Sequence, residues 1–259
     1  MLEFNAEIAQ LLENTYQGRD ITRRRHAVLE CLEPALGDKI ADIGCGNGML
    51  TLELARAVGK KGKVVGIEPS LEMRKLAIER CADFPQVEFL DGVANLLPLE
   101  DTSLDKAVSL QVFEYLKNIP GAVAEAHRVL KPGGRLVVGD FEWDTWSWYS
   151  ADPERMTKMM EAWDRHLVER RVPAILPDIL DNNGFVLEQT KALPFHDTKM
   201  APDGLAFLLL HLIESYVINN ELVEESVANA WAEEQRELAE KGKFFFSITH
   251  FQAIARKAA

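Results

Sequence analysis

The stretch that decides the fold is Lys-Ile-Ala-Asp-Ile-Gly-Cys-Gly-Asn-Gly, residues 39–48. Apolar, β-rich residues at 39–43 lead into a turn in which glycine occupies every second position, at Gly44, Gly46 and Gly48. Glycine lets a backbone turn tightly and approach a ligand closely, and the free N–H groups of a following helix favour an anion. The stretch therefore predicts a strand, a glycine-rich turn and a helix, with a nucleotide-like cofactor at the end of the strand.

Strand-like and helix-like patterns alternate along the rest of the chain. The expected strands are 39–43, 63–67, 87–90, 107–110, 135–139, 186–193 and 244–255. The expected helices are 49–58, 70–81, 120–130, 153–170, 174–182 and a pair within 204–241. Such alternation is typical of a parallel sheet built from βαβ units. We predict an α/β fold, a Rossmann-like three-layer sandwich around a seven-stranded, mostly parallel sheet whose last strand is antiparallel.

Two helical additions are expected beside this core. Apolar residues at helical spacing predict an N-terminal helical cap at residues 1–36, followed by one domain of residues 37–259. A helical lid is expected as an insertion at about residues 197–242. Its apolar run, 205–218, is too short to cross a membrane, and an acidic helix follows it. The lid helices are the predicted surface for a homodimer.

Composition and charge argue against several kinds of partner. A formal net charge of −12 and a pI near 5.0 repel nucleic-acid phosphates and anionic lipid surfaces. Residues 1–19 contain no basic start followed by an apolar segment, so a cytoplasmic location is predicted. Cys31, Cys45 and Cys81 show no paired spacing. We therefore predict no nucleic-acid partner, no membrane span, no disulfide framework and no metal site.

The glycine spacing and four further landmarks carry a family resemblance. The turn after Asp42 reads G-x-G-x-G, whereas dinucleotide folds have G-x-G-x-x-G, which disfavours NAD. The landmarks follow in order at 66–70, 97–98, 111–114 and 128–134. The chain resembles class I S-adenosylmethionine-dependent methyltransferases, above all the small-molecule enzymes of ubiquinone and menaquinone biosynthesis. The resemblance implies S-adenosylmethionine as cofactor and in-line transfer of its methyl group to an O, N, C or S atom of a small-molecule acceptor.

The resemblance assigns the methionine end of the cofactor to the glycine turn. Gly44, Cys45 and Gly46 would line this end through their backbone groups, and Gly48 completes the motif. Asp42 would order the turn and accept a hydrogen bond from the ammonium group of the cofactor, directly or through water. No feature of the sequence indicates that Cys45 is activated as a nucleophile.

The ribose and one side of the adenine are assigned to the segment after the second strand. Glu68 can accept both ribose hydroxyls with its two carboxylate oxygens. Pro69 and Met73 would flank the adenine, and packing inside a helix is an equal alternative for Met73.

The other adenine contact departs from the family pattern. Gly92, Val93 and Ala94 stand where the family commonly has Gly-Asp-Ala, so the acidic acceptor for the adenine amine is missing at position 93. Asp91, two residues earlier, could replace it only if the turn is rearranged. The backbone of Val93 and Ala94 is the alternative contact.

The acceptor pocket is expected after the fourth and fifth strands. Gln111 would face the cofactor, with Tyr115 beside the acceptor. The segment 141–149 contains three tryptophans and is expected to lie beyond the carboxyl end of the fifth strand. Trp143 and Trp146 would border the pocket, where rings attract a cation or stack on a planar substrate. Anchoring the following helices to the core is the alternative role for each ring.

No residue is identified as the catalytic base, and in-line methyl transfer can proceed by positioning alone. Glu114 is a candidate, with an exposed charge at the start of a helix as the equal alternative. His196, expected just past the sixth strand, and His211, expected on the lid, are candidates because histidine titrates near neutral pH. Structural roles are more common for such histidines.

Two other functions remain open, and two acceptor classes are disfavoured. A nicotinamide oxidoreductase and a non-catalytic protein that kept the cofactor fold are the alternatives. The residues 109–112, Ser-Leu-Gln-Val, lack the Asn/Asp-Pro-Pro-aromatic motif of base-amine methylation, and no Pro-Cys nucleophile for pyrimidine C5 occurs. Arsenite methylation would need several thiols near the cofactor, but only Cys45 is expected there.

Overall fold

A seven-stranded mixed sheet forms the centre of the molecule. The computed structural model describes residues 17–258. The strands are β1 (Lys39–Ile43), β2 (Lys63–Ile67), β3 (Val87–Leu90), β4 (Leu104–Leu110), β5 (Leu130–Trp148), β6 (Phe185–Asp197) and β7 (Phe246–Lys257). Their order is β3-β2-β1-β4-β5-β7-β6, and β7 is antiparallel to both of its neighbours. The predicted Rossmann-like sheet, parallel except for its last strand, is confirmed.

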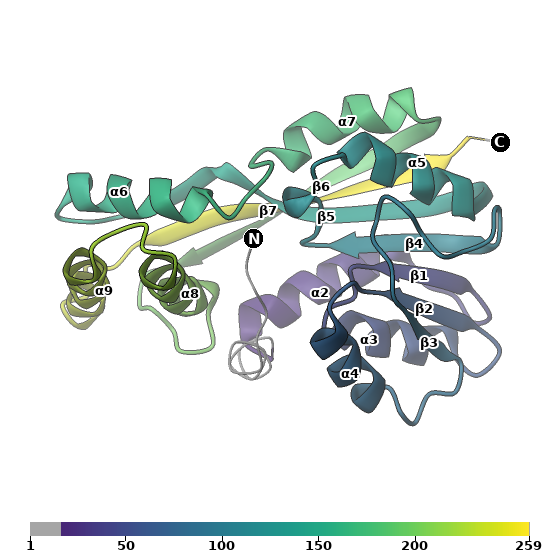
Figure 1. Ribbon diagram of the computed structural model, residues 1–259, viewed down its shortest axis with the longest axis horizontal. Coiled ribbons are helices and arrows are strands. Elements are labelled where there is room, and N and C mark those ends of the chain that lie inside the picture. The colour runs from purple at the N-terminus through teal and green to yellow at the C-terminus, as the bar shows by residue number, and fades with distance from the viewer. Residues whose placement is uncertain (1–16, 259) are drawn as a thin grey trace.

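Helices cover both faces of this sheet (Figure 1). One face carries α2 (Arg19–Leu32), α3 (Met49–Val58) and α4 (Leu71–Arg80), and the other carries α5 (Ile119–Val129) and α7 (Val172–Asn182). A short 3₁₀ helix, η1 (Phe113–Tyr115), follows β4. The three layers are those expected from the βαβ pattern, with α2 packed against the sheet strands β4, β5 and β7.

The strand sequences explain why both faces are covered. Side chains alternate between the two faces of a strand. On β1, Ile40 packs in the apolar cluster that contains α2 and α3, whereas Ala41 and Ile43 pack in the cluster that contains α5 and α7. On β5, Val137 packs in the cluster with α2 and α3, and Val138 packs in the cluster with α5 and α7. Strands buried on both faces read as continuous apolar runs, which is how they stand in the sequence.

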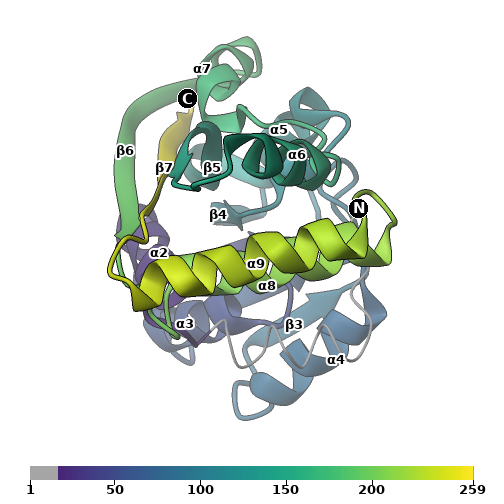
Figure 2. The ribbon, with the colours of Figure 1, turned by 90° about the vertical axis from the view of Figure 1, so that its left-hand side faces the viewer.

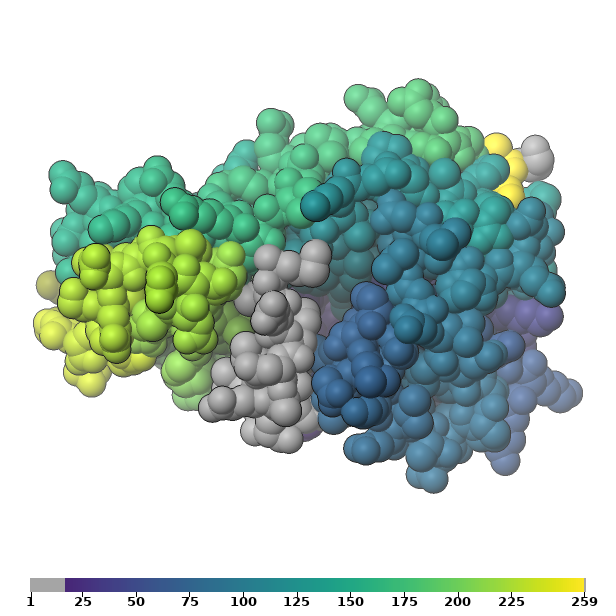
Figure 3. All heavy atoms as spheres, viewed as in Figure 1, coloured from purple at the N-terminus to yellow at the C-terminus, as the bar shows by residue number. Residues whose placement is uncertain are grey.

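A helical lid lies beyond one end of the sheet. It consists of α6 (Pro153–Asp164), α8 (Leu205–Asn219) and α9 (Glu225–Glu240). Seen from that end, α8 and α9 lie side by side and α6 runs above them (Figure 2). In the space-filling view these helices make up one end of an elongated molecule and the sheet half makes up the other (Figure 3). The predicted insertion at 197–242 supplies two of the three lid helices.

The fifth strand is much longer than the predicted 135–139. It runs through the expected turn at 131–134, which is a bulge against β4, and continues to Trp148 while pairing with β7. The prediction that 141–149 lies beyond the end of this strand is therefore wrong. Trp148 pairs with Phe246 and contacts Trp231 of α9, so the long ribbon connects the sheet to the lid. Its partner β7 comes about a hundred residues later, which no local pattern reveals.

Other differences concern the limits of elements. The expected helix 153–170 ends at Asp164, and the following residues form a loop before α7. The sixth strand continues to Asp197, so His196 lies inside β6 and not past it. The first part of the predicted cap, residues 1–16, lies outside the described residues. Within residues 17–258, no helix is long and apolar enough to cross a membrane.

Candidate active site

The glycine turn between β1 and α3 has the geometry that its sequence predicts. Gly44, Gly46 and Gly48 have φ angles of 73°, 53° and 78°, in the left-handed region that favours glycine. The N–H groups of Gly44 and Cys45 donate to the carbonyl of Ile67 at the end of β2, at 2.8 and 3.1 Å. The turn is thereby held at the carboxyl end of the sheet, where ligands of this fold class bind.

The three glycines face different surroundings. A Cβ on Gly44 would lie 2.4 Å from a methyl carbon of Val112, and one on Gly48 would lie 2.8 Å from the Cβ of Ala77. A Cβ on Gly46 would meet no described atom within 4 Å. Gly44 and Gly48 are therefore required by packing, whereas Gly46 presents bare backbone to open space, as expected where a ligand approaches the main chain.

Glu68 connects the second strand to this turn. Its carboxylate accepts hydrogen bonds from the N–H of Gly46 at 3.1 Å and from the N–H of Ser70 at 2.9 Å. Burial raises the pKa of Glu68, and the bonds from these two N–H groups oppose that shift. A carboxylate beside the open backbone of Gly46 is placed to accept the hydroxyls of a ribose.

Asp42 lies beneath the turn and is 1% exposed. Its carboxylate accepts a hydrogen bond from the hydroxyl of Thr51 in α3, at 2.6 Å. Burial raises the pKa of Asp42 to about 7, although this hydrogen bond opposes the shift. Burial also raises the pKa of the neighbouring Cys45 thiol, so Cys45 is not a reactive thiolate.

The residues predicted to contact the adenine differ in their exposure. Pro69 is exposed, whereas Met73 is buried in the apolar cluster that includes the lid. Val93 is exposed and Ala94 is buried beside it. Asp91 forms an ion pair with Arg74 at 3.1 Å.

The turn containing position 93 is nevertheless tightly defined. Val93 forms an isolated bridge with Leu96, and the N–H of Leu96 donates to the carbonyl of Val93 at 3.0 Å. A Cβ on Gly92 would lie 2.8 Å from the ring of Pro98. The family landmark is therefore kept as a backbone turn in which no acidic side chain stands at position 93.

Gln111, directly after the carboxyl end of β4, has an unusual backbone conformation. Its φ is 60°, which is uncommon for a residue with a side chain, and such conformations cluster at functional sites. Its N–H donates to the carbonyl of Gly139 at 2.7 Å, and its side-chain oxygen accepts from the guanidinium of Arg24 at 2.8 Å. Arg24 comes from α2 and was not identified from the sequence, because its neighbours Arg23 and Arg25 give it no distinguishing pattern.

Glu114 is buried, so the interpretation as an exposed charge is wrong. It is 1% exposed, and its carboxylate accepts from the indole N–H of Trp143 at 2.7 Å. Burial raises the pKa of Glu114, and hydrogen bonds from Gln111 and Trp143 oppose the shift. Burial and the charge of Glu114 also raise the pKa of Asp140, which sequence reasoning missed. Buried carboxyl groups with raised pKa values are common at functional sites.

The expected pocket rings lie at the junction between the sheet and the lid. Trp143 is buried and packs edge-on against Trp146, with ring centroids 5.4 Å apart. Tyr115, on η1, is half-buried and faces the ring of His166 at 5.9 Å. Both alternatives for the tryptophans thus have support, because the rings anchor the lid and stand at the edge of the site.

The two histidines proposed as bases lie elsewhere. His196 is exposed on β6, paired with Ser247 of β7. His211 is on α8, where its ring nitrogen lies 2.8 Å from the carbonyl of Phe207 one turn earlier. The structure brings neither to the glycine turn through any described contact. Among residues 17–258, no group of three or more histidine, cysteine, aspartate or glutamate side chains is arranged to hold a metal ion.

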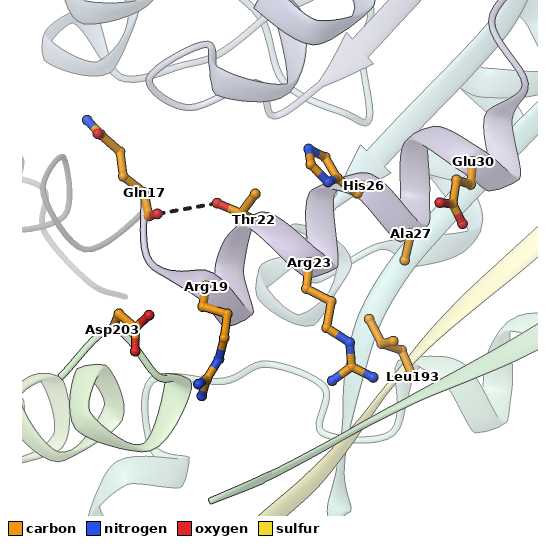
Figure 4. A pocket seen from close by; sticks show the side chains of 9 residues that line it. All are labelled: Gln17, Arg19, Thr22, Arg23, His26, Ala27, Glu30, Leu193 and Asp203. Carbon is orange, nitrogen blue, oxygen red and sulfur yellow. Dashed lines mark hydrogen bonds between the residues drawn. The ribbon is translucent and has the colours of Figure 1, made fainter. Parts of the chain in front are cut away.

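A separate surface cavity of about 690 Å³ lies along the outer side of α2. Arg19, Arg23 and His26 project from this helix, and Asp203 approaches from the segment before α8 (Figure 4). None of the residues predicted for the cofactor or acceptor lines this cavity. It mixes basic and acidic side chains and is not part of the site at the glycine turn.

Comparison with known sequences points to one domain. Residues 41–138 match the family described as a methyltransferase domain. A 2-phytyl-1,4-naphtoquinone methyltransferase from Synechocystis sp. is 37% identical over 109 residues, 40% of this chain and 45% of the relative. A demethylmenaquinone methyltransferase from Staphylococcus epidermidis is 35% identical over 117 residues, 44% of this chain and 47% of the relative. The matched region spans less than half the length of these relatives.

Solved structures extend the likeness to nearly the whole chain. The YcgJ protein from Bacillus subtilis has a TM-score of 0.61 at 19% identity, covering 92% of this chain and 99% of that one. The [4+2]-cyclase SpnF has a TM-score of 0.60 at 21% identity, covering 92% and 81%. A geranyl diphosphate C-methyltransferase from Streptomyces coelicolor has a TM-score of 0.57 at 16% identity, covering 92% and 76%. At such identities the likeness concerns the fold.

The fold alone does not decide the chemistry, since SpnF is named as a cyclase. The more specific likeness is in the sequence: residues 41–138 match a methyltransferase domain, and the two relatives named as quinone methyltransferases are 35–37% identical over part of the chain. The match places a methyltransferase domain at residues 41–138, on a sheet that has the Rossmann-like fold of the class I methyltransferases.

Proposed function

We propose that this protein transfers the methyl group of S-adenosylmethionine to a small-molecule acceptor. The observation that carries the proposal is the pairing of bare backbone at Gly46 with the carboxylate of Glu68, 3.1 Å from the Gly46 N–H. A carboxylate in this position fits a ribose diol, and a left-handed glycine turn fits a ligand that lies against the main chain.

Different residues of the site would bind different parts of the cofactor. The turn from Gly44 to Gly48, with Asp42 beneath it, would hold the methionine end, and Glu68 would hold the ribose. The backbone of Val93 and Ala94 would border the adenine. When bound, the sulfonium supplies an activated methyl group, so the protein needs to orient the acceptor in line and exclude water.

The acceptor is proposed to be a small, partly apolar molecule whose reacting atom is O, N, C or S. The half-buried rings of Tyr115 and Trp146 support an apolar acceptor, as do the relatives named for naphthoquinone and menaquinone methylation. The charge of −12 opposes nucleic acid. A homodimer through the lid helices and a cytoplasmic location remain predictions.

Replacing Glu68 by alanine is expected to weaken S-adenosylmethionine binding about 10- to 100-fold, because hydrogen bonds to a charged acceptor are lost. Titration calorimetry with S-adenosylmethionine and S-adenosylhomocysteine measures this. The matched control is Glu88→Gln, because Glu88 is a half-exposed carboxylate that pairs with Lys63 on the sheet. Its affinity should equal that of the wild type. Equal affinities of wild type and Glu68→Ala would refute the assignment of Glu68.

The same titrations separate the alternative functions. Binding of NAD without any affinity for S-adenosylmethionine would favour an oxidoreductase and overturn the proposal. Tight cofactor binding without turnover in a metabolite screen with labelled methyl donor would favour the non-catalytic alternative.

A further inference from the structure

His166 is an inaccessible histidine among aromatic rings at the junction between sheet and lid. It follows the end of α6 and is 3% exposed. Its ring centroid lies 3.8 Å from that of Trp163, 5.6 Å from Tyr216, 5.9 Å from Tyr115 and 6.0 Å from Trp143. These four rings come from α6, α8, η1 and β5, so His166 lies where the lid meets the carboxyl end of the sheet.

The protonation of this ring is defined by its contacts. Nδ1 of His166 is in contact with the carbonyl oxygen of Trp163, and a carbonyl only accepts, so Nδ1 carries the hydrogen. Burial lowers the pKa of His166 to about 4, so the ring is neutral at physiological pH. Nε2 therefore presents a lone pair. It is buried and has no hydrogen-bond partner among the described residues.

A donor without a partner lies on the adjoining ring. The indole N–H of Trp163 is also buried without a hydrogen-bond partner in the described part of the chain, and Trp163 is 2% exposed. Buried polar groups without partners are rare in folded proteins because they lower stability. The two rings are tilted by 41° with their centroids 3.8 Å apart, and one partner that both donates and accepts would satisfy both groups. A hydroxyl group does so, because it donates one hydrogen bond and accepts others.

The surroundings connect this pair of groups to the site at the end of β4. Tyr115 directly follows Glu114, and the carbonyl of Glu114 accepts from the N–H groups of Val168 and Glu169, at 2.9 and 3.0 Å. The loop that carries His166 is thus fastened to η1, three residues after Gln111. Tyr115 is half-buried, so the group of rings reaches the surface on that side.

We propose that His166 and Trp163 form the polar end of the acceptor subsite and bind the hydroxyl group of a planar, aromatic acceptor. The hydroxyl donates to Nε2 of His166 and accepts from the indole N–H of Trp163, while the surrounding rings hold the aromatic body. That the bound compound is the methyl acceptor rests on the proposed function. Binding itself needs no methyl donor, so the two can be tested separately.

The test compares 2-naphthol with its ether, 2-methoxynaphthalene, which has the same rings and cannot donate. Titration calorimetry is done on the wild type without cofactor and again with S-adenosylhomocysteine. The wild type is expected to prefer the naphthol about tenfold, the effect of one buried hydrogen bond. His166→Phe should reduce this preference to about twofold or less, with the affinity for the ether unchanged. His166→Gln, which keeps an acceptor, should retain part of it.

Further measurements distinguish a loss of binding from a loss of folding. His166→Phe removes the unpartnered Nε2 and also the contact of Nδ1 with the carbonyl of Trp163, so its thermal midpoint should fall only slightly. The control His26→Phe changes an exposed histidine of α2 and should preserve the preference. Trp163→Phe, which removes the donor together with part of the buried ring, should lower the naphthol preference by several-fold if His166→Phe fails to fold.

Three results would overturn the proposal. In the first, the wild type binds neither probe or does not distinguish them. In the second, His166→Phe and Trp163→Phe both keep the preference of the wild type for naphthol. In the third, His166→Phe has a much lower thermal midpoint but keeps that preference. The last would mean that Nε2 is satisfied inside the protein, for example by a buried water. Failure of cofactor binding in the Glu68 experiment would leave these outcomes unaffected and would refute only the methyl-transfer proposal.

Discussion

Gly44→Ala is expected to lower the free energy of unfolding by about 2–5 kcal/mol. A left-handed backbone costs a residue with a Cβ roughly 1–2 kcal/mol, and Gly44 has a φ of 73°. Overpacking adds about 1–3 kcal/mol. The new Cβ would lie 2.4, 3.0 and 3.3 Å from the three side-chain carbons of Val112, so no rotation of that side chain removes the contact. Urea denaturation of variant and wild type measures the difference.

Gly46→Ala is the matched control for this effect. Its φ of 53° carries similar backbone strain, but a Cβ there meets no described atom within 4 Å. It should lose about 1–2 kcal/mol of stability. Since the methyl group would project toward the ligand, S-adenosylmethionine affinity should fall more than this stability loss accounts for. If Gly46→Ala proves the more destabilising of the two, the described packing at Val112 is wrong.

Asp42→Asn is expected to stabilise the protein above pH 7 by about 4 kcal/mol. Burial raises the folded-state pKa of Asp42 from 3.8 to about 7, so between these values the folded chain holds a proton that the unfolded chain has released. The stability associated with this proton is complete below about pH 4 and is lost as pH rises to 7, at about 1.4 kcal/mol per unit. Asparagine has no such proton and keeps an acceptor for Thr51.

The measurement is the difference in unfolding free energy between Asp42→Asn and wild type from pH 4 to 8. Comparing the two proteins cancels the titration of the other groups. The difference should grow with pH and level off near pH 7. Asp83→Asn, at an exposed aspartate, is the control. A flat curve for Asp42→Asn would show that the carboxyl is ionised throughout. Weaker cofactor binding by the more stable variant would show that the buried acid is retained for function.

Much of the cofactor half of this site could be predicted because its requirements are local. The glycine positions follow from the left-handed backbone of a turn, and Asp42 and Glu68 stand next to strand ends that apolar runs identify. Parallel strands bring those ends to one edge of the sheet, so order along the chain becomes proximity in space. The specific roles of these residues toward the cofactor remain predictions until binding is measured.

The acceptor half could not be predicted in the same way. Trp143 was expected beyond the carboxyl end of the fifth strand, but β5 continues through it because β7, about a hundred residues later, supplies its pairing partner. An exposed charge was one of two equal alternatives for Glu114, and its burial involves the loop after α6, whose N–H groups donate to the Glu114 carbonyl. No local sequence pattern distinguishes His166, because the rings around it come from four separate elements.

The sequence by itself determined the α/β class, the glycine turn and the residues at the ends of the first two strands, because each depends on backbone conformations and apolar patterns within a few residues. Only the tertiary structure decided the length of β5, the burial of Glu114 and Asp140, the contact of Arg24 with Gln111 and the unpartnered edges of His166 and Trp163. The physical reason is that burial and hydrogen-bond satisfaction depend on segments distant along the chain. A side chain's charge and partners are therefore known only after the lid has packed against the sheet.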